Sequence, residues 1–323
     1  MQESLVSISI LNWNGKKMTA ECLKSLKKLK YQNYEVIVID NGSEDGSVEF
    51  LKKNFPEINL VCHKENKGFT GGHNAAHRVM KGKYLCLLNN DMVVDPSWLK
   101  NLVKVIEEDP KIGACGGGMF EWNKDHPIYN KNNPLWTIRY INKYTGFPWQ
   151  EKDHEEFKEA DYLSGGATLI RKDLIDRIGF FDDRFFAYAE DRDLSARMRR
   201  AGYKTMYIPK AFVWHKGSAT AKKVGYLANY WQYRNHLFFL FKNFDRGYLQ
   251  LALLLYLFRE IKGTAGDILK WRLDKNRLKA RVVIFFWFFC HLWLLIKMRR
   301  ESLAMFPKVK YNKLIGNERK PKK

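Results

Sequence analysis

The chain has 323 residues, a formal net charge of +21, 46% hydrophobic residues and 28% charged residues. These values exclude an intrinsically disordered chain and suffice for one large domain with an appended region. The five cysteines show no CxxC spacing, which indicates neither a disulfide framework nor a zinc site, and we expect a reduced, intracellular setting. The first residues enter a strand-like segment without the parts of a secretory signal peptide.

The positive charge is concentrated in the C-terminal third of the chain. Residues 216–323 hold 24 Lys and Arg against 6 Asp and Glu, whereas residues 1–215 hold 32 against 29. Nucleic acid would account for the charge but not for the apolar runs beside it, so we expect no nucleic-acid partner. Basic residues that flank apolar segments are typical of contact with an anionic membrane surface.

The N-terminal two thirds alternates between strand-like and helix-like segments, which predicts a parallel α/β sheet. We expect strands at residues 5–11, 34–39, 58–62, 84–88, 112–115, 203–208 and 211–214, with regular structure resuming at 162–171. We expect helices at 17–29, 44–54 (capped by Ser43), 73–80, 96–108 and 172–178, and another that ends near Gly202. Residues 120–159 are irregular and rich in aromatics, which favours an ordered lid or binding loop. Their aromatic side chains could stack on an acceptor or simply pack, and both interpretations stay open.

Beyond residue 220 the alternation stops, and we place a domain boundary there, between residues 1–220 and residues 221–323. Helices are expected at 226–244 and 248–258, and residues 282–296 form an apolar run of 15 residues without a charge. A spanning helix needs about 20 apolar residues. We therefore expect an interfacial helix or a re-entrant hairpin, with a short span and a buried core helix as the alternatives.

Polar residues follow the predicted strands. The strand that begins at Tyr84 ends abruptly in Asn89, Asn90 and Asp91, and apolar residues then resume. A carboxylate at the tip of a buried strand is where open α/β sheets place ligand chemistry, although the local sequence fits a polar turn equally well. Asp40, a glycine-containing loop, an acidic pair and a histidine occupy similar positions elsewhere in the chain. Each is more typical of a structural residue when taken alone.

Taken together and in order, these segments resemble the family 2 glycosyltransferases of the GT-A fold, and especially bacterial rhamnosyltransferase-like members. The resemblance covers residues 4–218. The matching segments are SILNWN (9–14), VIDNGS (38–43), NKGFTGGHN (66–74), LNND (88–91), SGGA (164–167) and AEDRDL (189–194), with Arg197, Gly202 and His215.

The resemblance implies a nucleotide-diphosphate sugar donor, either dTDP-rhamnose or a UDP-sugar. It assigns nucleotide-sugar contacts to Asn12, Asp40, Gly68, Gly72, Asn74, Asn89 and Asn90. Asp40 would accept a hydrogen bond from the N3–H of a uracil or thymine ring. Asp91 matches the last residue of the DxD motif of the family and would, with His215, hold Mg²⁺ or Mn²⁺. Asn89 and Asn90 replace acidic residues that are frequent in this motif, so a single carboxylate remains there.

The resemblance further implies that Asp191 is the general base of a single, inverting displacement. Gly165, Gly166 and Glu190 would position the sugar or the acceptor. The QxxRW motif of processive synthases is absent, since residues 231–235 read WQYRN, and this favours one transfer over polymerisation. A glycan or lipid-linked acceptor at the cytoplasmic face of the membrane, in cell-surface polysaccharide synthesis, fits the basic and apolar C-terminal region.

There are two alternatives to a glycosyltransferase function. A sugar-phosphate nucleotidyltransferase would need a glycine-rich signature bearing Arg or Lys near the N-terminus, where this chain reads LNWNG. The other alternative is a catalytically inactive, membrane-associated scaffold that binds a nucleotide sugar without transferring it.

Overall fold

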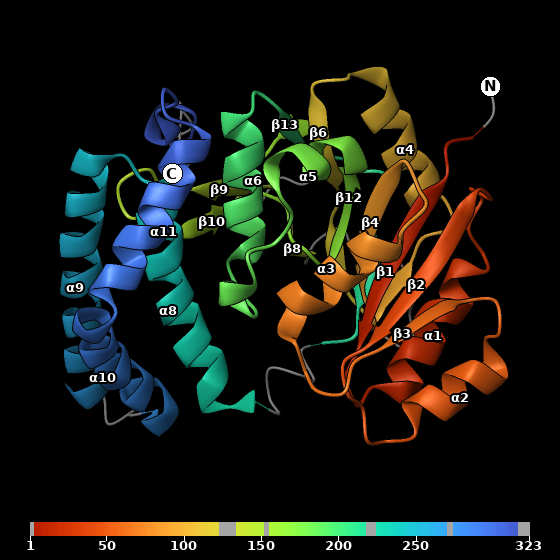
Figure 1. Ribbon diagram of the computed structural model, residues 1–323, viewed down its shortest axis with the longest axis horizontal. Helices are drawn as coiled ribbons and strands as arrows, with labels where there is room; N and C mark the ends of the chain where they lie inside the picture. The colour runs from red at the N-terminus through yellow and green to blue at the C-terminus, as the bar shows by residue number, and fades with distance from the viewer. Residues whose placement is uncertain (1–2, 123–133, 152–154, 218–223, 270–273, 316–323) are drawn as a thin grey trace.

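A central eight-stranded sheet organises the computed structural model, which describes all residues except 1–2, 123–133, 152–154, 218–223, 270–273 and 316–323 (Figure 1). Its strands are β1 (Val6–Asn12), β2 (Tyr34–Asp40), β3 (Asn59–Cys62), β4 (Tyr84–Asn89), β6 (Ile112–Gly116), β11 (Lys158–Glu159), β12 (Ala167–Arg171) and β13 (Lys204–Tyr207). They lie in the order β11-β13-β6-β12-β4-β1-β2-β3. A four-stranded sheet contains β5 (Met92–Val94), β7 (Met119–Glu121), β8 (Pro134–Trp136) and β14 (Val213–His215), and β9 (Arg139–Ile141) pairs with β10 (Pro148–Gln150).

Helices cover both faces of this sheet (Figure 1). The first face carries α1 (Lys16–Leu26), α2 (Ser47–Asn54) and α4 (Trp98–Glu108), and the second carries α3 (Gly68–Val79), α5 (Lys172–Ile178) and α6 (Glu190–Arg200). The period-2 alternation of a strand explains both cores. In β4, for example, Cys86 and Leu88 pack into the first core, whereas Leu85 and Leu87 pack into the second.

A third layer lies outside α6. It comprises α8 (Tyr226–Asn243), α9 (Arg246–Leu269), α10 (Lys275–Cys290) and α11 (Leu292–Met305). Two short 3-10 helices are also present, η1 (Asp183–Phe185) and η2 (Tyr311–Lys313). The core of this third layer joins Phe185 and Ala196 to Phe238 and Phe244 of the C-terminal region. The predicted boundary at residue 220 falls outside the described residues and stays a prediction.

The strand register brings the polar strand ends to one edge. β1 runs parallel to β2 and β4, with Asn12 opposite Asp40 and Leu11 opposite Asn89. The sheet is mixed rather than wholly parallel, because β12 is inserted antiparallel between β4 and β6 and β11 is antiparallel to β13. Four of its seven strand pairs are parallel. The parallel half positions the predicted nucleotide-sugar residues.

Two predicted helix starts are wrong. The helix expected from residue 44 begins at Ser47 after Gly46, and Ser43 caps no helix because its Oγ accepts from Asn14 N (2.9 Å) and Asn12 Nδ2 (3.1 Å). The helix expected from residue 73 begins at Gly68, so the predicted glycine loop forms the first two turns of α3. In both cases tertiary contacts override local propensity.

The irregular aromatic segment contains short strands, and residues 123–133 and 152–154 of it lie outside the described part. Some of its described aromatics pack within the protein, whereas Tyr144 and Phe157 are exposed. Tyr140 packs on Trp149 at 4.7 Å between ring centroids, and Phe147 stacks on His236 of α8 at 4.1 Å. For these residues packing explains the aromatic character, whereas the stacking of an acceptor on the segment stays a prediction.

The apolar run at 282–296 is split at His291 rather than forming one helix. The ring of His291 stacks on Trp287, and its Nδ1 lies 2.9 Å from the carbonyl oxygen of that residue. Among the described residues no single helix combines the length and apolar composition of a membrane span, whereas α10 and α11 meet both measures as a pair bent by 72°.

Candidate active site

Asn12 and Asp40 form the first part of the candidate site, at the adjacent ends of β1 and β2. Asn12 Nδ2 donates to Asp40 Oδ2 over 2.7 Å, and the backbone N–H of Ser43 donates to Asp40 Oδ1 over 2.8 Å. Asp40 is 1% exposed. Each carboxylate oxygen keeps a second lone pair, so a base N–H could still be accepted, and that role of Asp40 stays a prediction.

Thr19 of α1 links these strand ends to the amides that follow β4. Its Oγ1 donates to Asn12 Oδ1 over 2.7 Å and accepts from Asn90 Nδ2 over 3.0 Å. Asn90 is therefore continuous by hydrogen bonds with Asn12 and Asp40. Gly15 permits this arrangement, because a Cβ there would lie 2.6 Å from Asn90 Nδ2.

Asp91 and His215 meet where β5 and β14 pair antiparallel, with His215 opposite Met92. His215 Nε2 lies 3.1 Å from Asp91 Oδ2, and the backbone N–H of Lys216 donates to the carbonyl oxygen of Asp91 over 2.9 Å. Asp91 Oδ1 is buried without a hydrogen-bond partner. Within the described residues no group of three or more His, Cys, Asp and Glu side chains is arranged to hold a metal.

The pair Gly165 and Gly166 lies between the end of β4 and the start of α6. A Cβ on Gly166 would lie 3.0 Å from Asn89 Nδ2, and a Cβ on Gly165 would lie 3.0 Å from the ring of Phe69 and 3.8 Å from Asp191 Cβ. A larger residue at position 166 would press on Asn89 and one at position 165 would press on the ring of Phe69, whereas 3.8 Å to Asp191 Cβ is an ordinary van der Waals contact. The two neighbouring glycines therefore lie close to Asn89 and to Asp191 respectively.

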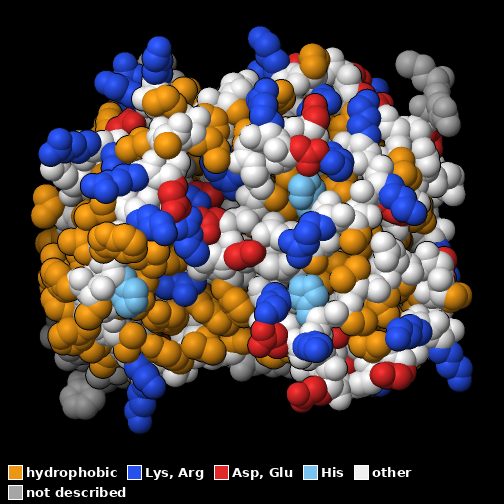
Figure 2. Space-filling model, in the orientation of Figure 1, with side chains coloured by type: hydrophobic (Ala, Val, Ile, Leu, Met, Phe, Trp, Pro, Cys, Tyr) orange, Lys and Arg blue, Asp and Glu red, His pale blue; other side chains and the backbone are white. Residues whose placement is uncertain are grey.

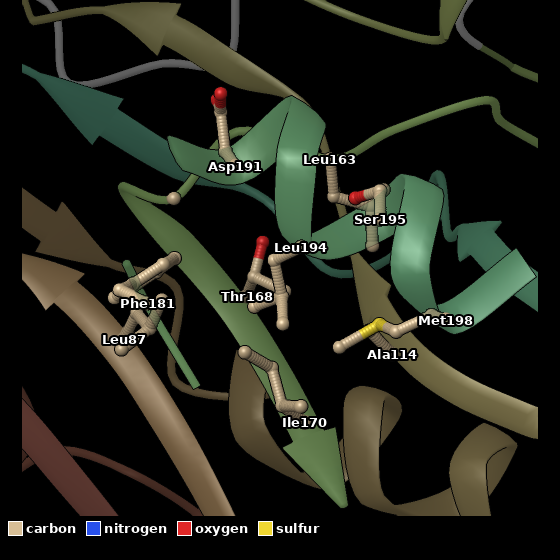
Figure 3. Close-up of a pocket in the computed structure, with 11 residues that line it drawn as sticks. Leu87, Ala114, Leu163, Thr168, Ile170, Phe181, Asp191, Leu194, Ser195 and Met198 are labelled. Carbon is tan, nitrogen blue, oxygen red and sulfur yellow. The ribbon is translucent and has the colours of Figure 1, made fainter. Parts of the chain in front are cut away.

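Asp191 lies in the first turn of α6, where the helix dipole favours negative charge. A small apolar pocket lies between α6 and the sheet, lined by residues such as Thr168, Ile170 and Met198. In Figure 3 the carboxylate of Asp191 points away from that pocket. The pocket is thus a gap in the packing beneath α6, and the Asp191 carboxylate is directed out of it.

Glu190 is buried, and its Oε2 has no hydrogen-bond partner. Burial, and secondly the negative charge of Asp191, raise the pKa of Glu190 to about 8. Glu190 is therefore protonated near pH 7 and can donate a hydrogen bond. A buried acid with a raised pKa is a common feature of catalytic sites.

The three predicted nucleotide-sugar residues of α3 have structural contacts instead of open surroundings. A Cβ on Gly68 would lie 2.5 Å from the carbonyl oxygen of Phe186, and one on Gly72 would lie 2.1 Å from Leu11 Cδ2. Asn74 Nδ2 donates to Asp183 Oδ1 over 2.7 Å. These contacts explain the residue types by packing, and the nucleotide-sugar roles of the three residues stay predictions.

The sequence reasoning missed two groups of residues around the site. Thr19 gave no signal, because a threonine within an amphipathic helix is unremarkable. Arg234 and Asn235 donate to backbone carbonyls of the loop that precedes Asp191. Their signal was a polar pair within an otherwise aromatic and apolar stretch, the same stretch in which the QxxRW motif was sought.

Comparisons with known proteins identify the family of the chain. Residues 7–179 match the family model for glycosyl transferase family 2. The chain is 26% identical over 217 residues to N-acetylglucosaminyl-diphospho-decaprenol L-rhamnosyltransferase of Mycobacterium tuberculosis, covering 60% of this chain and 70% of that protein. It is 26% identical over 205 residues to poly-beta-1,6-N-acetyl-D-glucosamine synthase of Staphylococcus aureus, covering 62% of this chain and 47% of that protein.

Solved structures share the fold. The mannosyltransferase PcManGT from Pyrobaculum calidifontis, in complex with GDP-Man and Mn²⁺, is 17% identical and has a TM-score of 0.58, covering 94% of this chain and 86% of that chain. GalNAc-T7 with UDP, GalNAc and Mn²⁺ is 16% identical with a TM-score of 0.58, covering 75% of this chain and 48% of that chain. Since the family model matches more than half of its residues, the chain belongs to glycosyl transferase family 2 and is a transferase of the GT-A fold.

Proposed function

We propose that the protein is an inverting glycosyltransferase that moves one sugar from a nucleotide-diphosphate sugar to a hydroxyl of a glycan or lipid-linked acceptor in cell-surface polysaccharide synthesis. The observation that carries this proposal is the shared edge of the sheet, where Gly165 and Gly166 lie between Asn89 and Asp191. Asp91 and His215 meet at the strand directly after Asn89. A base and a diphosphate-binding acid on either side of one turn suit a displacement at the sugar between them.

Asp191 is the group that would take the proton. The acceptor oxygen attacks C1 of the sugar, its proton passes to the Asp191 carboxylate, and the C1–O bond to the diphosphate breaks with its electron pair on the leaving group. Positioned bases of this kind contribute about 10²–10⁴-fold in rate. Glu190, whose raised pKa of about 8 keeps it protonated at neutral pH, would donate a hydrogen bond to the sugar or the acceptor.

Asp91 and His215 fit a divalent cation. The unpartnered Oδ1 of Asp91 is an oxygen donor of the kind that Mg²⁺ and Mn²⁺ prefer, and the imidazole of His215, with Nε2 3.1 Å from Oδ2, would add a nitrogen donor beside it. With two protein ligands, the remaining positions would go to diphosphate oxygens and water. When bound, such an ion neutralises charge on the leaving diphosphate. The Mn²⁺ in the two similar structures supports this proposal.

The donor is proposed to be dTDP-rhamnose or a UDP-sugar. The likeness to an L-rhamnosyltransferase supports the first and the likeness to a glucosamine polymer synthase supports the second. Asn12, Asp40 and Asn90 form one hydrogen-bonded row through Thr19, and Asn89 ends the neighbouring strand β4, so these residues would line the nucleotide sugar.

The acceptor is proposed to meet the enzyme at the cytoplasmic face of the cell membrane. Large apolar side chains are exposed on the C-terminal helices, among them Phe258 (64%), Phe286 (64%) and Trp293 (72%). Figure 2 shows hydrophobic side chains gathered over the region of α9 and α10 with Lys and Arg around them. A broad apolar patch with a basic rim suits an anionic lipid surface. Cosedimentation with anionic vesicles, lost on deletion of residues 280–323, tests this part.

A donor panel tests the function itself. The full chain is incubated with dTDP-rhamnose, UDP-glucose or UDP-N-acetylglucosamine, and release of the nucleoside diphosphate is measured with Mn²⁺. We expect release from one donor, and an about 10²–10⁴-fold slower release by Asp191→Asn with donor binding retained. Unchanged turnover in Asp191→Asn would refute the assignment of the base. Binding without release by the wild type, with membranes supplying acceptors, would instead support the inactive scaffold.

A further inference from the structure

The loop that leads into Asp191 has a strained backbone. Phe186, Tyr188 and Ala189 have φ angles of 64°, 73° and 68°, and they are three of the four non-glycine residues with positive φ in the described part of the chain. Phe186, with a ψ of −62°, is the centre of a γ-turn that is closed by a 2.7 Å hydrogen bond between its two neighbours. Side chains disfavour such conformations, so surrounding contacts must hold the loop in place.

Asn235 of α8 supplies three of these contacts. Its Nδ2 donates to the carbonyl oxygens of Phe185 (2.7 Å), Ala187 (2.7 Å) and Tyr188 (2.8 Å). The side chain is fully buried, and its two amide hydrogens serve three acceptors, so one hydrogen is shared. Its Oδ1 accepts from Arg234 Nε over 3.0 Å, which fixes the end of the amide that faces the loop.

The loop is held from its other side as well. Phe186 O accepts from the backbone N–H groups of Phe69 (2.7 Å) and Thr70 (3.1 Å) at the start of α3. On the α8 side, Arg234 Nη2 also donates to the carbonyl oxygen of Phe185 over 3.0 Å. The loop is thus clamped between α3 of the transferase fold and α8 of the C-terminal region. Alanine at position 235 would offer no donor, and aspartate would turn oxygens toward the carbonyl oxygens of the loop.

We propose that Asn235 is a positioning residue for catalysis, whose three hydrogen bonds set the left-handed loop and thereby the place of Asp191. The proposal rests on the proposed function, in which Asp191 is the base. Asn235 itself is buried behind the loop, so it would act on the sugar donor and the sugar acceptor only through the loop. Through this amide, the C-terminal region determines the geometry of the catalytic carboxylate.

The first test is Asn235→Ala in the full chain, measured as release of nucleoside diphosphate from the donor panel. A misplacement of about 1 Å at a catalytic group can cost about 10²-fold in rate, and we expect kcat to fall by about that factor. We expect the donor KM, and the affinities for dTDP and UDP measured by calorimetry, to change by less than about twofold, because Asn12 and Asp40 lie on other elements.

Asn243→Ala is the matched control. Asn243 is also fully buried on α8, and its Nδ2 donates to Asp193 Oδ1 over 3.0 Å rather than to the loop. We expect this variant to lower Tm about as much as Asn235→Ala while it keeps kcat within about twofold of the wild type. A general loss of stability would lower kcat in both variants alike, and that result would overturn the proposal.

A double variant separates positioning from structure. If Asn235 acts through Asp191, then Asn235→Ala in an Asp191→Asn background causes no further loss of kcat, whereas a further 100-fold loss, on the order expected of an independent effect, overturns the proposal. Arg234→Lys keeps the charge but gives up the fork of hydrogen bonds to the loop carbonyls, and it serves as the second variant should the alanine variant not fold. A wild-type chain that releases no nucleoside diphosphate refutes the proposed function instead.

Discussion

Lys242 of α8 joins two buried acids of the transferase fold, and Lys242→Met breaks both contacts. Its Nζ lies 2.7 Å from Asp182 Oδ2 and 3.0 Å from Asp193 Oδ2, and the side-chain exposures of the three residues are 7%, 14% and 1%. Each acid retains one cation, since Arg184 stays with Asp182 and Arg197 stays with Asp193. Methionine keeps the apolar stem of the lysine but leaves these acids short of one positive charge.

Removing one partner of a buried ion pair costs about 3–5 kcal/mol of unfolding free energy. Because both acids retain a second cation, we expect the lower end, about 3 kcal/mol. In a large domain about 1 kcal/mol shifts Tm by about 2–4 °C, so calorimetry at pH 7 should show a Tm about 6–12 °C lower. The control is Lys104→Met, which removes an exposed 3.9 Å contact with Glu108 and should leave Tm unchanged.

The effect of Lys242→Met should also depend on pH. Burial alone would raise the pKa of Asp182 and of Asp193, but Arg184 and Lys242 lower the first, and Lys242 and Arg197 lower the second. A lowered pKa in the folded state stabilises the protein above the unfolded value of about 3.9 and loses that effect as the pH falls below it. The Tm difference between wild type and variant should therefore be constant from about pH 5 to pH 7 and shrink below about pH 4. A difference below about 2 °C at pH 7, or an equal shift in the control, would refute the reasoning.

Three other variants test the site and the surface. In the wild type, Glu190 has a pKa of about 8 and becomes charged beside Asp191 above that pH, so we expect the rate to fall on the alkaline side of the pH–rate profile. Glu190→Gln should remove this alkaline fall, and identical profiles for the variant and the wild type would contradict the prediction. Asp91→Asn should raise the Mn²⁺ concentration needed for half-maximal turnover by at least about 10–100-fold, which is the loss in metal affinity when a residue that only supports a ligand is replaced. An unchanged Mn²⁺ requirement would exclude Asp91 as a ligand. The double variant Phe289→Ser, Trp293→Ser should bind anionic vesicles more weakly by about 100-fold or more, because each aromatic side chain that is no longer buried costs about 1.5–3 kcal/mol of binding free energy. The control is Phe157→Ser, since Phe157 is exposed elsewhere on the molecule, and this variant should bind like the wild type.

The strand-end residues could be predicted because their signals are local. Asn12, Asp40 and Asn89 are the last residues of β1, β2 and β4, directly after buried apolar runs. Parallel neighbours in a sheet end at the same edge, so recognising three such strands is enough to bring these side chains together. The antiparallel strand β12 lies on the other side of β4 from β1 and β2, so it does not change the edge at which these parallel strands end.

The start of α3 could not be predicted from local sequence. Glycine in a helix is less favourable than alanine by about 1 kcal/mol, and three glycines occur between residues 68 and 72. What compensates is close packing, since a Cβ on Gly72 would lie 2.1 Å from Leu11 Cδ2 and one on Gly68 would lie 2.5 Å from Phe186 O. These partners are far away in the sequence, and only the folded chain shows that a helix there can approach β1 and the catalytic loop.

The role of Asn235 lay beyond sequence reasoning for a related reason. A buried amide on an aromatic helix indicates that acceptors exist, but it does not say where they are. Here they are the carbonyls of a loop some fifty residues earlier in the chain, and their direction depends on backbone angles that side chains disfavour. A local conflict with propensity at a functional loop is where such reasoning is expected to fail.

The position of α8 would give the C-terminal helices a part in the proposed catalysis as well as in the proposed membrane contact. One side of α8 holds the loop before Asp191 through Asn235 and the buried acids of the transferase fold through Lys242. Its other side packs against α10 and α11, which carry the exposed apolar residues (Figure 1). A chain without α8 would leave Phe185 of the third core uncovered and the loop carbonyls without their amide donor. We therefore expect the first 217 residues alone to keep the strand-end residues in register but to lose the placement of Asp191, so that donor binding would outlast turnover.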